Sequence, residues 1–292
     1  MKPAGSAKSP EAEPADDGND MQSLFTSVTR SFMRALFPPR CYACGAFIRD
    51  QPGSVNVPSP APSPAGPLGK LLAPCLCRSC IDQYSPVESP ICPCCGKMFA
   101  ARSDADHWCG ECLKHRRKYS RARSAGLFED PLLTLIHRLK YHGRSELAGP
   151  LGKLLYHAYT RHWADRRIDW IVPVPLHSKK RRRRGFNQAR LLVARWPEYP
   201  AGGKKSAPAE IRSDLLCRVR YTASQTGLGR QEREQNLKGA FELKDGADLT
   251  GRSILLIDDV FTTGSTVTEC AKVLRAGGAG RVDVLTLARA GG

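Results

Sequence analysis

The segment 254–266 constrains the fold more than any other part of the sequence. It begins with an apolar run rich in β-branched residues, which is too short for an independent helix and typical of a strand buried on both faces of a parallel sheet. Asp258 and Asp259 follow at the expected carboxyl end of this strand, and a short loop comes next. Beyond the loop, apolar residues recur at helical spacing up to Gly277. The segment therefore predicts a strand, a loop and a helix, which together form the repeating unit of an α/β fold.

The loop between this strand and helix has the chemistry of a sugar-phosphate site. A helix N-terminus presents free backbone N–H groups and a positive dipole end, which favour an anion. Gly264 allows a tight turn and close approach of the backbone, while Asp258 and Asp259 suit vicinal hydroxyls or a magnesium ion. Hydroxyl donors without bulk come from Thr262, Thr263, Ser265 and Thr266. The alternative is an ordinary strand-to-helix turn with a threonine at the helix N-cap.

The whole segment 254–266 resembles the phosphoribosyl pyrophosphate (PRPP) signature of type I phosphoribosyltransferases. The resemblance implies that Asp258 and Asp259 are the catalytic-site carboxylates and hold the ribose hydroxyls. It also implies that the loop holds the 5′-phosphate through Thr262, Thr263, Gly264, Ser265 and Thr266. PRPP is accordingly the expected ligand, and Mg²⁺ is expected to accompany it.

Eight of the twelve cysteines form four Cys-x₂-Cys pairs, and this spacing is typical of metal-binding knuckles. The chain lacks a recognisable secretion signal, which argues against a disulfide framework. Eight thiolates make two tetrahedral sites with no open position, so we expect two structural zinc ions. The sequential pairing places one ion on Cys41, Cys44, Cys77 and Cys80, and the other on Cys92, Cys95, Cys109 and Cys112.

Other arrangements of the cysteine region satisfy the same spacing. The pairs can interleave, and Cys75 or Cys94 can replace a neighbour if a knuckle is shifted, which affects Cys77 and Cys92 most. His107 and His115 are substitute ligands, and redox-labile thiols are the competing interpretation of the region.

A run of six cations lies directly after an apolar segment that ends near Val172. With the net charge of +17, this run favours polyanionic partners, and a solvated basic loop is the alternative. We assign nucleic-acid contact to Lys179, Lys180, Arg181, Arg182 and Arg183. Arg184 and Gly185 precede a predicted helix, which makes a second anion site. In type I phosphoribosyltransferases the corresponding loop contacts pyrophosphate.

Several features together resemble the ComF family of competence-associated proteins. They are the cysteine knuckles, the residues Val-Pro-Val-Pro-Leu at 172–176, Arg-Gly-Phe-Asn-Gln at 184–188, the segment 225–236 and the carboxylate pair. The resemblance implies an α/β fold, with a type I phosphoribosyltransferase-like parallel sheet flanked by helices and preceded by a small double zinc ribbon. The segment 225–236 resembles a mobile lid that closes over PRPP, with Gln225, Arg233 and Asn236 as lid residues.

This resemblance and the composition together predict the division of the chain. The expected parts are a disordered tail (1–20), an amphipathic helix (21–38), the double zinc ribbon (39–118, with a flexible Pro/Ser/Ala-rich insertion at 51–72) and a phosphoribosyltransferase domain (119–292). The amphipathic helix packs on the neighbouring domain or docks on a partner or a membrane surface. No apolar run reaches the ~18 residues that span a bilayer, so we expect a soluble cytoplasmic protein.

Two functions from different classes remain open at this stage. The first is phosphoribosyl transfer from PRPP with release of pyrophosphate, linked to DNA uptake or utilisation. The second is a PRPP-regulated module, without catalysis, that binds single-stranded DNA or a DNA helicase of the uptake machinery.

Overall fold

The computed structural model describes residues 37–48, 66–99, 105–199, 209–222, 230–244 and 246–291. The expected tail 1–20 and most of the expected helix 21–38 lie outside these residues. By its contacts the chain divides at Pro39, and the segment from Arg40 to Gly292 forms one compact unit. The division predicted between residues 118 and 119 stays a prediction.

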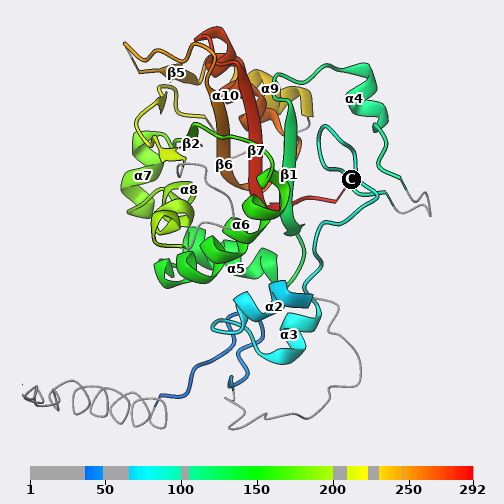
Figure 1. The fold of residues 1–292 in the computed structure, drawn as a ribbon. Helices are drawn as coiled ribbons and strands as arrows, with labels where there is room; N and C mark the ends of the chain where they lie inside the picture. Colours follow the sequence, from blue (N-terminus) through cyan, green and yellow to red (C-terminus); the bar gives the residue numbers. More distant parts are fainter. Residues whose placement is uncertain are drawn as a thin grey trace, which may run out of the picture. The chain divides into compact units, whose positions relative to one another are not determined.

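A five-stranded sheet forms the centre of this unit (Figure 1). Its strand order is β1-β7-β6-β2-β3, and all four neighbouring pairs are parallel. The strands are β1 (Arg121–Leu127), β7 (Arg281–Arg289), β6 (Ser253–Phe261), β2 (Trp170–Pro173) and β3 (Glu210–Ile211). A separate antiparallel pair consists of β4 (Leu216–Arg218) and β5 (Phe241–Leu243). The predicted α/β class, with a parallel sheet flanked by helices, is confirmed.

The first three helices lie in the cysteine region, and the others lie between the strands along the chain. The short ones are α2 (Gly66–Leu72), α3 (Arg78–Asp82), α4 (Gly110–Lys114), η1 (Ser145–Leu147), α7 (Ser178–Arg184), α8 (Gln188–Val193) and η2 (Trp196–Glu198). The longer ones are α5 (Leu132–Tyr141), α6 (Ala148–Trp163), α9 (Arg230–Leu237) and α10 (Ser265–Ala276). None of the helices in the described residues combines the length and the apolar character that crossing a lipid bilayer requires.

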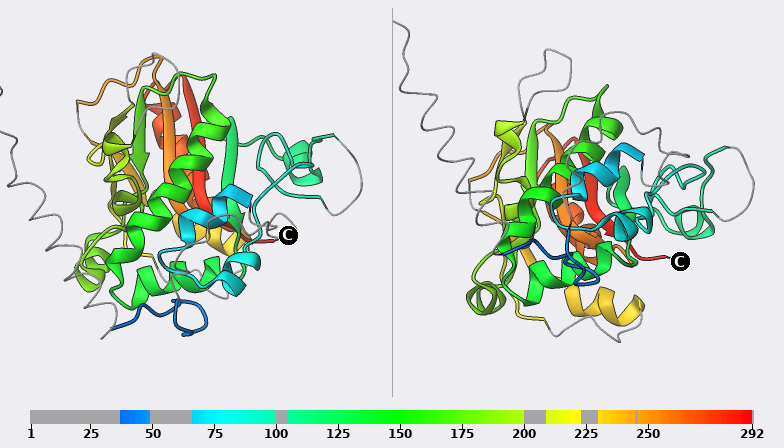
Figure 2. Two further views of the ribbon diagram at one scale, coloured as in Figure 1. Left: turned by 60° about the horizontal axis from the view of Figure 1, so that its bottom comes forward. Right: turned by 90° about the horizontal axis from the view of Figure 1, so that it is seen from below.

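Alternation along the central strands builds two hydrophobic cores. Leu255 and Ile257 of β6 belong to one core with α5, α6 and α8, whereas Ile254 and Leu256 belong to the other with α10. Successive side chains of a strand point to opposite faces, so a continuous apolar run is buried on both sides of the sheet. Figure 2 shows the helices on the two faces. The strand predicted from residues 254–257 thus has the double burial that its composition indicates.

The structure differs from the predicted elements at three places. β6 continues past the two carboxylates to Phe261, because β7 pairs alongside it as far as Arg289. The end of the expected flexible insertion, Gly66–Leu72, forms α2, and its Leu72 is fully buried. The basic run after β2 forms the short helix α7 instead of a loop, because the His177 side chain accepts a hydrogen bond from Lys179 N and Gly185 ends the helix at φ 86°.

Candidate functional site

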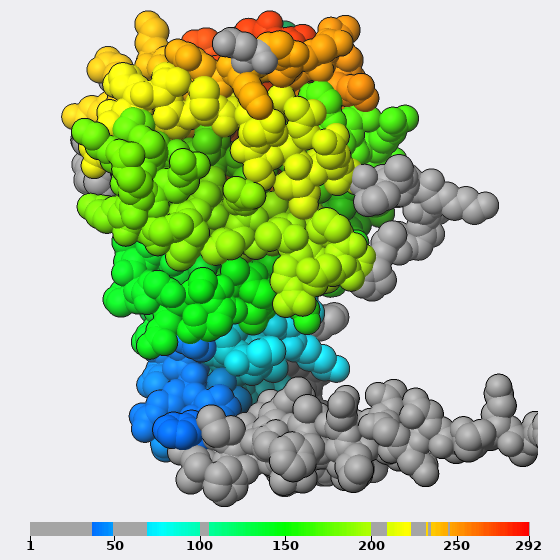
Figure 3. Space-filling view, turned by 90° about the vertical axis from the view of Figure 1, so that its left-hand side faces the viewer, coloured from blue at the N-terminus to red at the C-terminus, as the bar shows by residue number. Residues whose placement is uncertain are grey.

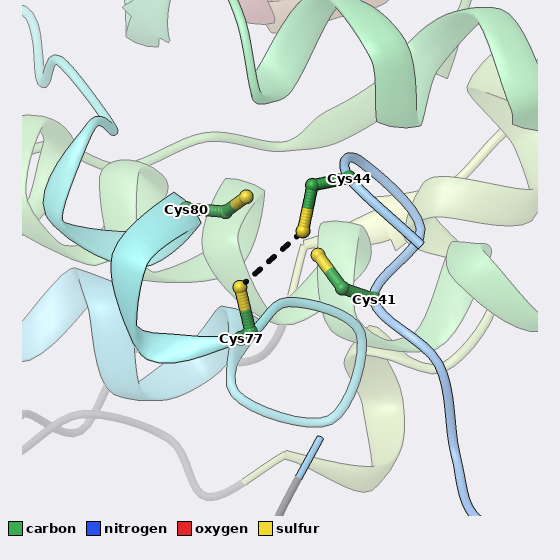
Figure 4. Close-up of side chains that lie close together, drawn as sticks. All are labelled: Cys41, Cys44, Cys77 and Cys80. Atoms are coloured by element: carbon green, nitrogen blue, oxygen red, sulfur yellow. Dashed lines mark hydrogen bonds between the residues drawn. The ribbon is translucent and has the colours of Figure 1, made fainter. Parts of the chain in front are cut away.

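Each of two groups of four cysteines brings its sulfur atoms within 4.8 Å of one another. The groups are Cys41, Cys44, Cys77 and Cys80 (Figure 4), and Cys92, Cys95, Cys109 and Cys112. This is the sequential pairing, and the interleaved arrangement does not occur. Cys75 and Cys94 belong to neither group; Cys75 Sγ lies 3.2 Å from the carbonyl oxygen of Leu72. His107 also lies outside both groups, with its ring stacked on Phe99.

The two cysteine groups are built in the same way. In each, the first pair lies in a hairpin closed by a backbone bridge, Arg40 to Phe47 or Ile91 to Met98. The second pair begins a short helix, α3 or α4, with its first cysteine at the N-cap. Four donors from two rigid turns converge on one point in each group, which is how structural metal sites are made.

The distances between sulfur atoms suit zinc. A tetrahedral zinc ion with Zn–S bonds of about 2.3 Å holds its ligands about 3.8 Å apart. Cys44 and Cys77 have their sulfur atoms 3.6 Å apart, and those of Cys95 and Cys109 are 3.7 Å apart. Burial raises the pKa of Cys41, but backbone N–H groups of Cys44 and Cys77 outweigh burial and lower the pKa to about 6, whereas burial and the neighbouring thiols raise the pKa of Cys80. The first group therefore contains a thiol that is readily ionised, as a metal ligand must be.

The turn from β6 to α10 occupies the carboxyl end of the sheet. Gly264 takes a left-handed conformation at φ 76° and is the N-cap of α10. A Cβ at this position would lie 2.6 Å from Cζ of Phe261, so a larger residue would displace the ring and strain the backbone. The hydroxyls of Thr263 and Ser265 lie 2.7 Å apart. The turn thus combines hydroxyls, a glycine and the N-terminus of a twelve-residue helix.

The carboxylate pair faces cations that come from distant parts of the chain. Lys140 of α5 forms an ion pair with Asp259, which is only 4% exposed. Burial raises the pKa of Asp258 to about 6, although the charges of Lys140, Arg218 and Arg184 act in the opposite direction. Burial also lowers the pKa of Lys140 to about 8. Two carboxylates and three cations therefore share one partly desolvated site.

Arg184 and Gly185 lie where α7 ends. The guanidinium of Arg184 donates to Gln188 Oε1 at 2.5 Å and lies 5.4 Å from the ring centroid of Tyr141. Asn187 caps α8 by accepting from Ala189 N, and its Nδ2 donates to the carbonyl of Val174 at 3.0 Å. The structure therefore fixes this loop to the end of β2, and the charge of Arg184 acts on Asp258. The two sequence segments predicted to form one site lie close together.

The predicted lid segment is only partly described. Gln225 lies outside the described residues, and Arg233 lies in α9. Near Asn236, the Arg220 guanidinium donates to the carbonyls of Asn236 and Lys238 at 2.9 and 2.7 Å. The β4–β5 pair joins the two ends of this excursion.

The second cysteine group is connected to the β6–α10 turn through one arginine. Arg289 of β7 donates to the carbonyl of Cys95 at 2.6 Å, and its guanidinium lies 4.8 Å from the ring centroid of Phe261. The same Phe261 ring lies against Gly264. A continuous set of contacts therefore links Cys95 to the turn.

The arrangement of cysteine groups and sheet can be compared with known proteins. The chain is 35% identical over 222 residues to competence protein F of Haemophilus influenzae, and the alignment covers 74% of this chain and 90% of that protein. The chain belongs to the ComF family. It is also 36% identical over 221 residues to the DNA utilization protein YhgH of Escherichia coli K12, covering 73% of this chain and 90% of that protein.

A more distant ComF relative is competence protein ComFC of Bacillus subtilis, which is 25% identical over 224 residues and has 84% of its length covered. No model of a protein family matches the chain. The predicted ComF resemblance is confirmed, together with the two cysteine groups.

Lys140 is the site residue that sequence reasoning missed. Lys140 lies in α5, and sequence reasoning gave it no role. Its neighbours His137, Arg138 and Tyr141 are exposed or half-buried, so no local pattern marked Lys140 as a residue that faces the carboxylates.

Proposed function

We propose that the chain binds PRPP and transfers its phosphoribosyl group to an acceptor, with release of pyrophosphate. The observation that carries this proposal is the geometry at the end of β6. There a carboxylate pair is followed by a hydroxyl-rich turn at the N-terminus of α10, and Arg184 from the α7–α8 loop acts on the same pair. A sugar that carries one phosphate at one end and two at the other matches this arrangement of one carboxylate pair and two anion-binding loops.

The proposed roles follow from the chemistry of each group. Asp258 and Asp259 accept hydrogen bonds from the ribose hydroxyls, and the backbone N–H groups of the turn, with Thr263 and Ser265, donate to the 5′-phosphate. Arg184 and the adjacent Gly185 hold the pyrophosphate. Carboxylate oxygens are also the ligands that Mg²⁺ prefers, and Mg²⁺ bound with PRPP would offset the charge of the leaving pyrophosphate.

The reaction is a displacement at C1 of the ribose. A bond forms between C1 and the acceptor nucleophile, the bond from C1 to pyrophosphate oxygen breaks, and the electron pair leaves with pyrophosphate. In our proposal the protein contributes by orienting the two reactants and stabilising the charge on pyrophosphate. The segment 225–236 closes over the site and excludes water, with Gln225, Arg233 and Asn236 as the lid residues.

Calorimetric titration of PRPP with Mg²⁺ tests the binding part of the proposal. We expect Asp258→Asn and Asp259→Asn to weaken PRPP binding by about tenfold or more, because each removes a charged hydrogen-bond acceptor. Asp165→Asn, an exposed carboxylate outside the site, is the matched control. Equal affinity in the wild type and both variants would refute the ribose assignment.

A screen for pyrophosphate release tests the transfer part. The protein is incubated with PRPP, Mg²⁺ and a set of nucleobases and nucleotides, and pyrophosphate is measured. Release that depends on one acceptor and disappears in Asp258→Asn supports transfer. PRPP binding without release for any acceptor supports a binding module instead.

The second candidate is a PRPP-regulated module that binds single-stranded DNA. One relative has the name DNA utilization protein, and two are named competence proteins. In this chain, α7 presents Arg181, Arg182 and Arg183 to solvent. Tyr221 is 48% exposed, and the ammonium groups of Lys179 and Lys180 lie 5.8 and 5.6 Å from its ring centroid.

Proteins that bind single-stranded nucleic acids combine cations, which contact the phosphates, with exposed aromatic rings, on which the bases stack. Figure 3 shows the face with α7 in light green beside the yellow surface of the segment 209–222. A DNA helicase of the uptake machinery is the protein partner that we propose for this module.

Fluorescence anisotropy with a labelled single-stranded oligonucleotide tests the DNA proposal. Replacing Arg181, Arg182 and Arg183 by alanine is expected to weaken binding and to make it less dependent on salt. The control replaces Lys70, Lys153 and Arg166, which are exposed on other parts of the unit. Equal loss in both triple variants would show only a general charge effect and would refute a binding site on α7.

A further inference from the structure

A cavity of about 650 Å³ lies beside α10. Of its lining residues only Ser265 has a role in the proposed PRPP site, and Gln235 lies in the proposed lid segment. Its walls come from the connector 115–118, from Gln235 and Lys238 at the end of α9, and from one face of α10. On α10 the lining residues are Ser265, Thr268, Glu269 and Lys272. They recur at intervals of three and four residues, so they form a single stripe along the helix.

The cavity is strongly cationic. Its lining contains five basic side chains, namely Arg116, Arg117, Lys118, Lys238 and Lys272. The one carboxylate in the lining, Glu269, is already engaged: it accepts from Gly239 N at 2.9 Å and lies 3.9 Å from Lys272 Nζ. Like charges gathered around a concave space raise the local concentration of anions.

Two residues that line this space each carry a buried donor atom without a partner, although the Arg117 guanidinium also lies 4.0 Å from Glu111. Thr268 Oγ1 and Arg117 Nε are buried and have no hydrogen-bond partner among the described residues. Buried polar atoms are normally paired, and an unpaired one commonly marks the place of a missing ligand or water. The cavity therefore offers both charge and hydrogen bonds to an anion.

We propose that this cavity binds a phosphorylated small molecule that carries at least two phosphate groups, such as a nucleoside diphosphate. The volume falls in the range of about 300–1,000 Å³ that is typical of small-molecule sites. Of the five cations, Arg117 lies 4.0 Å from Glu111 and Lys272 lies 3.9 Å from Glu269, and the other three carry charge enough for two phosphate groups. Three segments form the walls of this cavity, whereas the exposed cations of α7 lie along one helix and suit an extended chain.

This site is separate from the PRPP site, and the inference does not depend on PRPP binding. Asp258, Asp259, Lys140 and Arg184 are not among its lining residues. The two places share Ser265, whose hydroxyl lies 2.7 Å from that of Thr263 in the β6–α10 turn. Because both ligands are anions near one helix N-terminus, we expect each to weaken binding of the other by a limited, reciprocal factor.

Calorimetric titration of the full, zinc-loaded chain with ADP tests the proposal, with adenosine as the uncharged comparison. We expect ADP to bind and adenosine not to bind. Lys238→Ala and Lys272→Ala are each expected to weaken ADP binding by about tenfold, since each removes a charged donor to phosphate. Lys153→Ala on α6 is the matched control, and its ADP affinity is expected to equal that of the wild type.

Three outcomes would overturn the proposal. One is the absence of ADP binding to the wild type at millimolar concentration. Another is binding that Lys238→Ala and Lys272→Ala leave unchanged, or that they reduce no more than the Lys153→Ala control does. A third is binding of a single-stranded oligonucleotide, but not of ADP, that depends on the two lysines.

A competition titration distinguishes this site from the proposed PRPP site. If ADP affinity falls by a limited factor and then stays constant as PRPP increases, the two ligands occupy separate, coupled sites. If it keeps falling in proportion to PRPP, both ligands use one site and the proposal is overturned. If the chain does not bind PRPP, the proposed function fails, while the lysine variants still test the cavity.

Discussion

Replacing Lys140 by methionine is the most direct test of how the acidic site is held together. Methionine keeps an apolar stem of similar length but removes the charge that pairs with Asp259. The side chains of Lys140 and Asp259 are 17% and 5% exposed, so the variant leaves a buried carboxylate without its partner. Removing one member of a buried ion pair destabilises a protein by about 3–5 kcal/mol.

For a unit of this size, a destabilisation of this magnitude corresponds to a fall in Tm of roughly 6–20 °C. Circular dichroism melting at pH 7 and a fixed zinc concentration measures it, with Lys153→Met on the exposed face of α6 as the control. The double variant Lys140→Met/Asp259→Asn removes both charges and should recover most of the lost stability.

Two results would refute this reasoning. If Lys140→Met lowers the free energy of unfolding by less than about 1 kcal/mol, the pair behaves as an exposed surface contact. If the double variant is no more stable than Lys140→Met, the two side chains do not interact, and the cost of the single variant comes from packing alone.

Three further predictions concern the site and the cysteine groups. Burial holds the pKa of Asp258 at about 6, above its ordinary value, so protons compete with PRPP at low pH. Affinity should fall by up to about tenfold per pH unit below 6 and lose this dependence in Asp258→Asn, as measured by calorimetry from pH 5 to 7, a range that lies below the pKa of about 8 for Lys140. Gly264→Ala should destabilise the chain by about 1–2 kcal/mol and weaken PRPP binding, because the φ of Gly264 is 76°. Gly149→Ala is the control, since an added Cβ there meets no atom within 4 Å, and it should change neither the melting temperature nor the PRPP affinity. Elemental analysis should find two zinc ions per chain, one in Cys44→Ser and two in Cys217→Ser, and a content well below two in the wild type would contradict the double ribbon.

The local parts of the fold could be predicted from the sequence because their signals are local. The spacing identified the four Cys-x₂-Cys knuckles, since each must present both sulfur atoms on one side of a turn. It left the pairing of the knuckles open, and the structure shows the sequential pairing. The apolar run before Asp258 similarly indicated a strand buried on both faces. In both cases the pattern specifies the structure over a few neighbouring residues.

Features that depend on distant partners could not be predicted in this way. The strand β6 continues beyond Asp259 only because β7 lies beside it. The ion pair of Lys140 requires α5 to pack against the end of that strand, and no pattern around Lys140 encodes this contact. A run of like charges favours a solvated loop, but in α7 the cap from His177 and the left-handed Gly185 define a helix.

The hydrogen bond from Arg289 to Cys95 connects the second cysteine group to the end of β7. The carbonyl that receives this hydrogen bond belongs to Cys95, one of four cysteines whose sulfur atoms could hold a metal ion. Oxidation of these thiolates, or withdrawal of the ion by a stronger chelator, would release Arg289 and with it the Phe261 ring that lies against Gly264. Binding of the proposed PRPP ligand at the end of the sheet would then depend on the metal supply and on the redox state around the protein.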